Sequence, residues 1–143
     1  MSAFTVDRLR DGLADSGRAL EDSTVLVVGA TYRPGVPELL NSPAISITER
    51  LARLGASVHT CDPLLDDIGP LAGELIDLER AASLNPDGVV VVTPHDAFAD
   101  FEWGSFDPAV VVDCHYAVDL EGTAHTEYTI GRPGPNGSGS DVA

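Results

Sequence analysis

Lysine is absent from this sequence of 143 residues, and arginine supplies all eight of its basic side chains. Acidic side chains number 23, so the formal net charge is −15 at pH 7. A field of that sign repels the phosphates of DNA and RNA, which argues against a nucleic-acid-binding protein. Because the acidic residues are scattered along the chain, we favour adaptation to high salt (a halophilic protein) over an acidic surface for one partner.

Long apolar runs and cysteines are also scarce. No run approaches the roughly 20 residues that a membrane-spanning helix needs, and the polar, acidic N-terminus does not resemble a signal peptide. The two cysteines, Cys61 and Cys114, are too few for a disulfide framework or a metal site. In the strand order predicted below they lie three strands apart, beyond the reach of a disulfide. We therefore expect reduced thiols in a cytoplasmic protein that does not enter a membrane.

Two kinds of apolar segment alternate along the chain and predict an α/β fold. Continuous runs at 23–29 and 88–92 are typical of strands buried on both faces of a parallel sheet. Residues 4–18 show the helical period, and Ser42-Pro43 is typical of a helix start. Further strands are expected at 56–61, 74–78, 109–113 and 127–130, and helical segments at 43–54, 64–73, 78–84 and 95–106.

This alternation predicts a three-layer Rossmann-like parallel sheet in the order 3-2-1-4-5-6, with helices on both faces and an N-terminal helix before it. We divide the chain into that helix (1–20), the Rossmann-like domain (21–130) and a disordered tail (131–143) rich in Gly, Pro and Ser. Ligands of such sheets lie beyond the carboxyl ends of the strands, near the point between strands 1 and 4 where the strand order switches.

The loop after the first strand lacks the glycine pattern G-x-G-x-x-G of dinucleotide-binding folds. Without those glycines the backbone cannot closely approach a pyrophosphate, so we do not expect a standard NAD site here. The loop offers Tyr32 and Arg33 instead, and the helix start at Pro43 adds attraction for an anion. On these residues alone, a surface loop in which Arg33 pairs with Glu38 is an equal alternative.

The stretch from Val25 to Pro63 resembles the C-terminal domain of the UDP-glucose/GDP-mannose dehydrogenase family. The shared pattern is a strand ending in Gly, an aromatic residue, a basic residue, an acidic residue, Ser-Pro, a helix, Gly-Ala and Asp-Pro; these are Gly29, Tyr32, Arg33, Glu38, Ser42-Pro43, Gly55-Ala56 and Asp62-Pro63. Residues 89–98 and 110–120 fit the later strands of that family, and 4–18 resemble the end of its long interdomain helix.

The resemblance implies a role for each matching position. It places Tyr32 and Arg33 against a UDP-sugar, and it places His115 where the family has the Arg of an Asp-Gly-Arg triplet. It puts Glu38 on the cofactor side of the cleft. Leu40 stands where the family has an Arg that reaches toward NAD, so productive NAD geometry is not implied by this chain alone.

No catalytic residue is assigned, because the glycine-rich segment that carries the family's nucleophilic Cys has no counterpart here. Cys114 and His115 are adjacent in an expected strand end, where neighbouring side chains point to opposite faces. No metal site is assigned either, since neighbouring carboxylates such as Asp66-Asp67 are usually solvated. We interpret His59 as structural and His95 as the start of a helix, with Asp96 complementing the helix dipole.

The resemblance implies the UDP-sugar-binding domain of an NAD-dependent nucleotide-sugar 6-dehydrogenase, an oxidoreductase of polysaccharide biosynthesis acting on UDP-glucose or a UDP-N-acetylhexosamine. NAD and the catalytic Cys would then come from an N-terminal NAD-binding domain or subunit, in a homo-oligomer. The apolar stripe at 4–18 supports such a partner, because we expect an isolated helix with an exposed apolar face to need one. The alternatives are a non-catalytic nucleotide-sugar-binding module and a degenerate stand-alone domain.

Overall fold

The strand that follows the N-terminal helix is apolar at nearly every position because both of its faces are buried. In this β-strand, β1 (Thr24–Val28), Val25 and Val27 belong to one core cluster while Leu26 and Val28 belong to a second on the opposite face. An alternating polar pattern would leave one of these faces in water, so the continuous run is what a central parallel strand requires.

The computed structural model describes residues 2–31, 39, 42–93, 95, 109–113 and 126–129. The other elements, in chain order, are α1 (Ser2–Asp15), a 3₁₀ turn (Leu20–Asp22), α2 (Pro43–Arg53), β2 (Ser57–Cys61), β3 (Glu74–Ile76), α3 (Leu78–Ala82), β4 (Gly88–Val91), β5 (Val110–Asp113) and β6 (Thr126–Thr129). Within these residues, no helix has both the length and the apolar character needed to cross a membrane.

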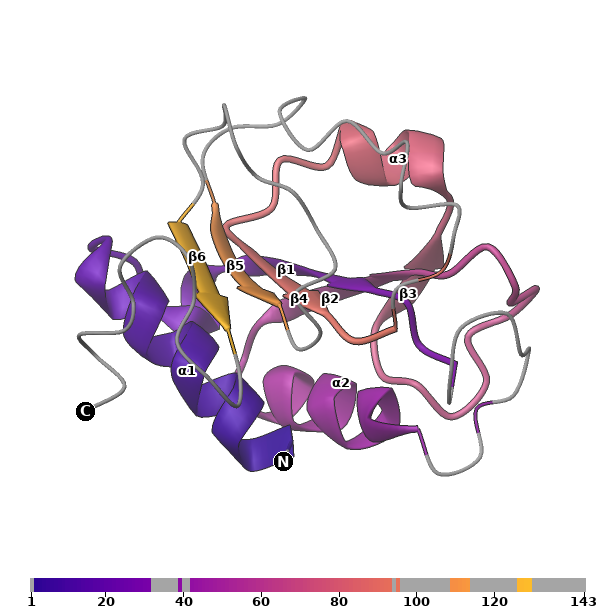
Figure 1. Ribbon diagram of the computed structural model, residues 1–143, viewed down its shortest axis with the longest axis horizontal. Helices are drawn as coiled ribbons and strands as arrows, with labels where there is room; N and C mark the ends of the chain where they lie inside the picture. Colours follow the sequence, from indigo (N-terminus) through magenta and orange to yellow (C-terminus); the bar gives the residue numbers. More distant parts are fainter. Residues whose placement is uncertain are drawn as a thin grey trace.

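The strands form one parallel sheet in the order β3-β2-β1-β4-β5-β6. The order predicted from the sequence is confirmed for β1 to β5, and β6 lies parallel to β5 at the edge. Helices α1 and α2 cover one face of the sheet and α3 lies on the other, which gives the predicted three layers (Figure 1). From β1 to β3 the strands are added on one side of β1. After β3 the chain crosses back, and β4 pairs with β1 on the side opposite β2.

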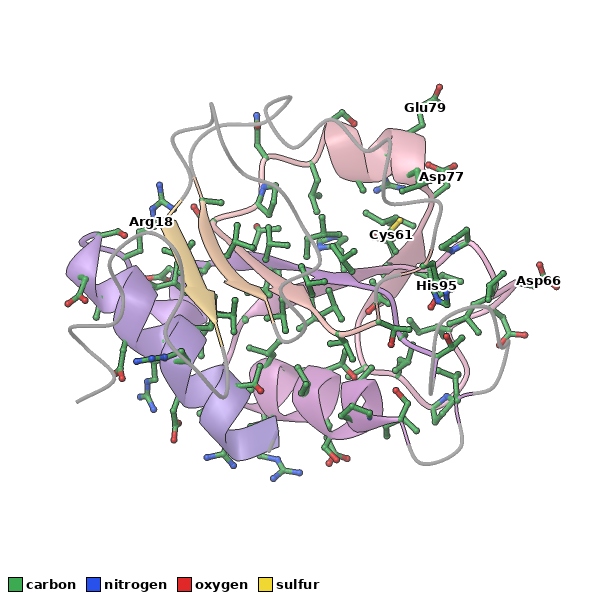
Figure 2. The ribbon with its side chains drawn as sticks, viewed as in Figure 1. Arg18, Cys61, Asp66, Asp77, Glu79 and His95 are labelled. Carbon is green, nitrogen blue, oxygen red and sulfur yellow. The ribbon has the colours of Figure 1, made fainter. Side chains whose placement is uncertain are left out.

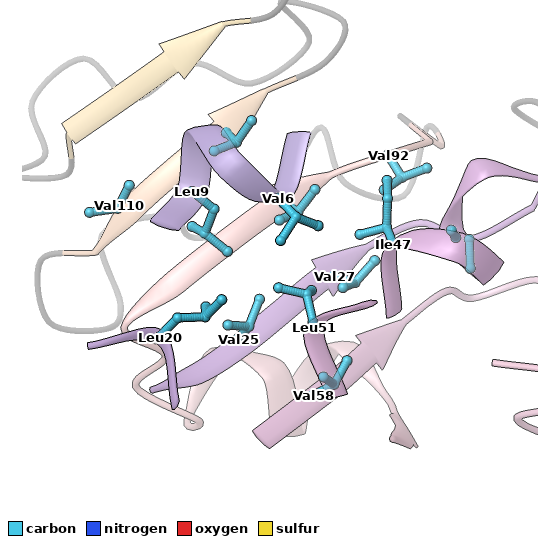
Figure 3. Packing of buried hydrophobic residues seen from close by; sticks show 14 of the residues in the cluster. Val6, Leu9, Leu20, Val25, Val27, Ile47, Leu51, Val58, Val92 and Val110 are labelled. Carbon is cyan, nitrogen blue, oxygen red and sulfur yellow. The ribbon is translucent and has the colours of Figure 1, made fainter. Parts of the chain in front are cut away.

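Helix α1 is docked on the sheet of its own chain. Val6, Leu9 and Leu13 are fully buried, and the helix packs against α2, β4 and β5. Figure 3 shows Val6 and Leu9 in the same apolar layer as Val110 of β5. The expectation that this stripe presents an exposed face to a partner chain is therefore wrong, because the protein's own sheet covers it. The helix also begins and ends earlier than the expected range of 4–18.

Helix α2 has the boundaries that its end residues predict. The side chain of Ser42 accepts a hydrogen bond from the backbone N–H of Ala44 at 3.1 Å, and Pro43 occupies the first helical position. Leu54 forms the C-cap before Gly55. Ile47 and Leu51 project from the buried face of the helix onto β1, as seen in Figure 3.

The segment between β2 and β3 forms turns, and the helix expected at 64–73 is wrong. Pro70 cannot donate the backbone hydrogen bond that a continuing helix needs. The first turn of the segment is held by Asp62, whose side chain accepts from the N–H of Leu64. Leu71 is buried, and the N–H of Ala72 donates to Thr48 Oγ1 at 3.2 Å, so the segment lies on α2.

Candidate functional site

The residues that the sequence predicts to bind ligand, Tyr32, Arg33, Glu38 and His115, all lie outside the described residues. The structure does describe the backbone and side chains from which their loops depart. The first loop leaves the sheet after Thr31 and returns at Ser42. Both of these residues are buried at the carboxyl edge of the sheet, beside the neighbouring ends of β1 and β4.

A buried carboxylate organises this edge. Asp62, which follows β2, accepts hydrogen bonds at Oδ2 from the backbone N–H of Ala30 at 2.6 Å and of Thr31 at 3.1 Å. His95, which follows β4, contacts the same oxygen through Nε2 at 2.8 Å. The side chain of Asp62 is 0% exposed and that of His95 is 4% exposed. We call Ala30, Thr31, Asp62, Thr93 and His95 the Asp62 cluster.

The hydrogen bonds of the cluster fix the position of the His95 proton. Asp62 Oδ2 already accepts from two backbone N–H groups, so the proton between it and His95 belongs to the imidazole Nε2. The same nitrogen lies 2.9 Å from Thr31 Oγ1. His95 therefore stands between the ends of β1 and β2 as a buried donor, and it is half of an ion pair whenever both groups are charged.

Two further contacts hold the start of the loop. Thr93 Oγ1 donates to the carbonyl oxygen of Thr31 at 2.6 Å, and the hydroxyl of Ser42 donates to the carbonyl oxygen of Ala30. Both peptide groups at 30 and 31 thus have their N–H and C=O bonded to residues from other elements. Burying a carboxylate is costly unless donors surround it, and the Asp62 cluster supplies them.

The cluster does not fit the binding of NAD in the manner of a dinucleotide fold. In that fold, glycines let the backbone approach a pyrophosphate, and an acidic residue after the second strand bonds the ribose. Here the acidic residue after β2 is Asp62, and its Oδ2 bonds the N–H groups of Ala30 and Thr31 instead. A Cβ on Gly29 would lie 1.9 Å from Thr93 O, so backbone already fills the space beside that glycine.

Sequence reasoning missed the pairing of Asp62 with His95. It placed His95 at a helix start and Asp62 only within an Asp-Pro break, although both follow strands that flank β1. The two residues are 33 positions apart, and only their shared sheet edge brings them together. The signal that could have found them was the strand order itself, since parallel strands end at one edge.

A pocket of about 560 Å³ lies at the carboxyl ends of β2 and β3, beside the start of α3. It is lined by Cys61, Asp62, Pro63, Leu65, Leu75, Ile76, Asp77, Leu78 and Glu79. Figure 2 shows Cys61 between Asp77, at the start of α3, and His95. Burial, with the nearby charges of Asp62 and Asp77, raises the pKa of the Cys61 thiol from 9.0 to about 12. A thiol that stays protonated at neutral pH is a poor nucleophile.

Structural partners account for His59 and for the charged side chains of Glu74, Asp77 and Arg80 near this pocket. His59 Nε2 lies 3.4 Å from Glu74 Oε1 on the neighbouring strand, and Arg80 reaches the same carboxylate at 3.8 Å. Asp77 caps α3 by accepting from the N–H of Arg80 at 2.8 Å. Among the described residues, no group of three or more His, Cys, Asp or Glu side chains could hold a metal ion.

Known proteins match a region of the chain that contains the Asp62 cluster. Residues 26–120 match the UDP-glucose/GDP-mannose dehydrogenase family, UDP binding domain. The UDP-N-acetyl-D-mannosamine dehydrogenase of Methanococcus maripaludis is 33% identical over 89 residues, covering 62% of this chain and 20% of that protein. The UDP-N-acetyl-D-glucosamine 6-dehydrogenase of Salmonella typhi is 23% identical over 128 residues, covering 85% of this chain and 30% of that protein.

Solved structures share the fold. The NDP-N-acetyl-D-galactosaminuronic acid dehydrogenase of Methanosarcina mazei superimposes with a TM-score of 0.78 at 22% identity, over 92% of this chain and 29% of that one. The UDP-D-ManNAc dehydrogenase of Pyrococcus horikoshii gives a TM-score of 0.72 at 20% identity, over 90% of this chain and 30% of that one. The chain spans less than a third of the length of each of these relatives.

Proposed function

We propose that this chain binds the UDP part of a UDP-sugar. It belongs to the UDP-glucose/GDP-mannose dehydrogenase family and matches the UDP binding domain of that family. The ligand would lie at the carboxyl edge of the sheet, beside the ends of β1 and β4. The observation that carries this proposal is the Asp62 cluster, which holds both peptides at Ala30 and Thr31 directly before Tyr32 and Arg33.

The charge of the protein makes local donors necessary for such a ligand. With a formal net charge of −15, the protein as a whole repels a diphosphate. The N–H groups of Ala30 and Thr31 are already bonded to Asp62, so other donors, among them side chains of the loop, must supply the attraction. Arg33 can form two parallel hydrogen bonds to phosphate oxygens, and Tyr32 can stack on a ring. His115 would add a donor from the loop after β5.

The oxidation itself would need a second part. The relatives that this chain matches are dehydrogenases of which the matched region covers only 30% and 20%. We propose that an N-terminal domain or subunit supplies the NAD site and the catalytic Cys, with Glu38 facing it, in a cytoplasmic homo-oligomer. The sugar would be UDP-glucose or a UDP-N-acetylhexosamine, and its C6 hydroxyl would be oxidised to a carboxylate for polysaccharide biosynthesis.

Calorimetry on the 143-residue chain tests the proposal, with UDP, UDP-glucose, UDP-N-acetylglucosamine and NAD as ligands. We expect UDP and the UDP-sugars to bind, and Arg33→Ala to weaken binding by about tenfold or more, since hydrogen bonds to charged groups are worth about 1.5–3 kcal/mol. Arg53→Ala is the matched control, because it removes the same charge from an exposed position on α2. A folded chain that binds no UDP contradicts the proposal.

A non-catalytic nucleotide-sugar-binding module is the second candidate, favoured by Leu40 and His115 at positions where the family has Arg. The two candidates differ when the chain is mixed with the N-terminal half of a relative and assayed for NADH formation. Activity in the mixture that depends on Arg33 favours the dehydrogenase; UDP binding without activity favours the module.

A further inference from the structure

We propose that Asp62 and His95 are positioning residues for UDP recognition, holding the base of the loop that carries Tyr32 and Arg33. This inference rests on the proposed function. It adds two residues that lie outside that loop, and it excludes the N–H groups of Ala30 and Thr31 as donors to the diphosphate, because both bond Asp62.

The first step is the geometry at Oδ2 of Asp62. One oxygen atom bonds two consecutive N–H groups, at 2.6 Å and 3.1 Å, and so fixes the orientation of both peptides at Ala30 and Thr31. The next Cα along the chain is only about 3.8 Å further on. Tyr32 and Arg33 follow directly in the chain, so a change in the orientation of either peptide would change the direction in which the chain leaves Thr31.

The second step is the support of Asp62 itself. Its Oδ1 accepts from the N–H of Leu64 at 2.9 Å, and its Oδ2 accepts from His95 Nε2 at 2.8 Å. Among the described residues, His95 is the only one that donates to Asp62 through a side chain, and it follows β4. It therefore links Asp62 to the strand on the opposite side of β1 and holds the carboxylate toward that strand.

The third step separates a positioning role from a merely structural one. Loss of any buried hydrogen bond lowers stability, so stability alone decides nothing. Val110 offers a matched control, because it is 1% exposed and pairs with Gly88 at the amino edge of the same sheet, away from the cluster. Val110→Ala lowers stability through a cavity and leaves the carboxyl edge intact.

The experiment measures UDP affinity by calorimetry and unfolding by urea in the wild-type chain and in Asp62→Ala, His95→Ala, His95→Gln and Val110→Ala, at a temperature where each is folded. We expect Asp62→Ala and His95→Ala to weaken UDP binding by about tenfold or more, as small misplacements of binding groups do. Val110→Ala should stay within about twofold of wild type, since distant sites act independently. His95→Gln keeps a neutral donor and should recover most of the affinity.

The outcomes are distinguishable. If Asp62→Ala does not fold, the two His95 variants carry the test, and their affinities must differ in the order stated. If the His95 variants are folded and bind UDP as tightly as wild type, the positioning role is wrong while the proposed function stands. If the wild-type chain binds no UDP, the proposed function fails and this inference fails with it.

Discussion

Gly29 ends β1 at a place where two backbones nearly touch. Its φ is +77°, and a Cβ built on it would lie 1.9 Å from the carbonyl oxygen of Thr93. Its N–H donates to Cys61 O at 2.8 Å. The glycine therefore lets the ends of β1 and β4 approach each other, whereas in a dinucleotide fold a glycine here would make room for a phosphate.

The effect of the close contact at Gly29 on stability can be compared with that of a glycine with a similar φ and no close neighbour. Gly17 has a φ of +80°, and nothing lies within 4 Å of its Cβ position. Ala at either site pays the left-handed backbone cost of about 1–2 kcal/mol. We expect Gly17→Ala to lower the free energy of unfolding in urea by that amount, and Gly29→Ala to lower it by about 2 kcal/mol more or to prevent folding. Equal losses would mean that the close approach does not exist in solution.

At the scale of single residues, the sequence predicts positions better than partners. It places Gly29, Asp62 and His95 correctly at strand ends, because apolar runs stop there. It does not predict that the carboxylate of Asp62 bonds the loop and His95, since such pairing depends on which strands are neighbours and on their register. The roles predicted for Tyr32, Arg33, Glu38 and His115 stay predictions.

At the scale of elements, helix α1 illustrates what periodicity can and cannot tell. The apolar stripe predicts a helix with one buried face, and Val6, Leu9 and Leu13 are that face. The pattern does not say what covers it. Gly88 at the start of β4 lacks a side chain where Leu9 sits: a Cβ there would lie 2.8 Å from Leu9 Cδ1. Complementarity of this kind between distant residues is invisible in either segment alone.

Docking of α1 predicts a large cost for truncating its central side chain. Leu9→Ala should lower the free energy of unfolding by about 2–5 kcal/mol, because the fully buried leucine leaves a cavity above β4. Asp7→Ala changes an exposed residue of the same helix and should cost within about 0.5 kcal/mol. Urea titrations of the two variants make the comparison. Similar small losses would mean that α1 is not held on the sheet and would restore the expectation of a partner for it.

Strand and helix boundaries depend on the strength of the local signal. Continuous apolar runs predict β1 and β4 to within one residue at each end, since burial on both faces leaves no other pattern. The acidic segment 64–73 has weak periodicity and a central proline, and its expected helix is absent among the described residues. The parallel order of β1 to β5 followed from the alternation of helices and strands together with right-handed crossovers.

At the scale of the whole molecule, the net charge of −15 acts on stability through self-repulsion. Salt shortens the range of that repulsion from about 10 Å at 0.1 M to about 3 Å at 1 M. We expect the melting temperature to rise by about 5 °C or more when KCl is raised over that range. Sucrose, which is excluded from the surface without screening charge, is the control for a general cosolute effect. A melting temperature that is flat or falls with KCl would contradict the high-salt interpretation.

The family membership predicted from the sequence is confirmed over residues 26–120. That region begins inside β1 and includes the Asp62 cluster. Helix α1 lies before it and nevertheless contributes fully buried side chains to the main core.

The Asp62 carboxylate accepts from the main-chain N–H groups of Ala30 and Thr31, and the hydroxyl of Ser42, at the other end of the same loop, donates to the main-chain carbonyl oxygen of Ala30. These hydrogen bonds do not depend on which side chains the residues between Thr31 and Ser42 carry. The sequence of the intervening segment can therefore change, or be replaced by that of another family member, while these hydrogen bonds are kept. On the proposed function, the ligand preference of this protein would then be separable from the scaffold, and the loop would be a suitable unit for exchange.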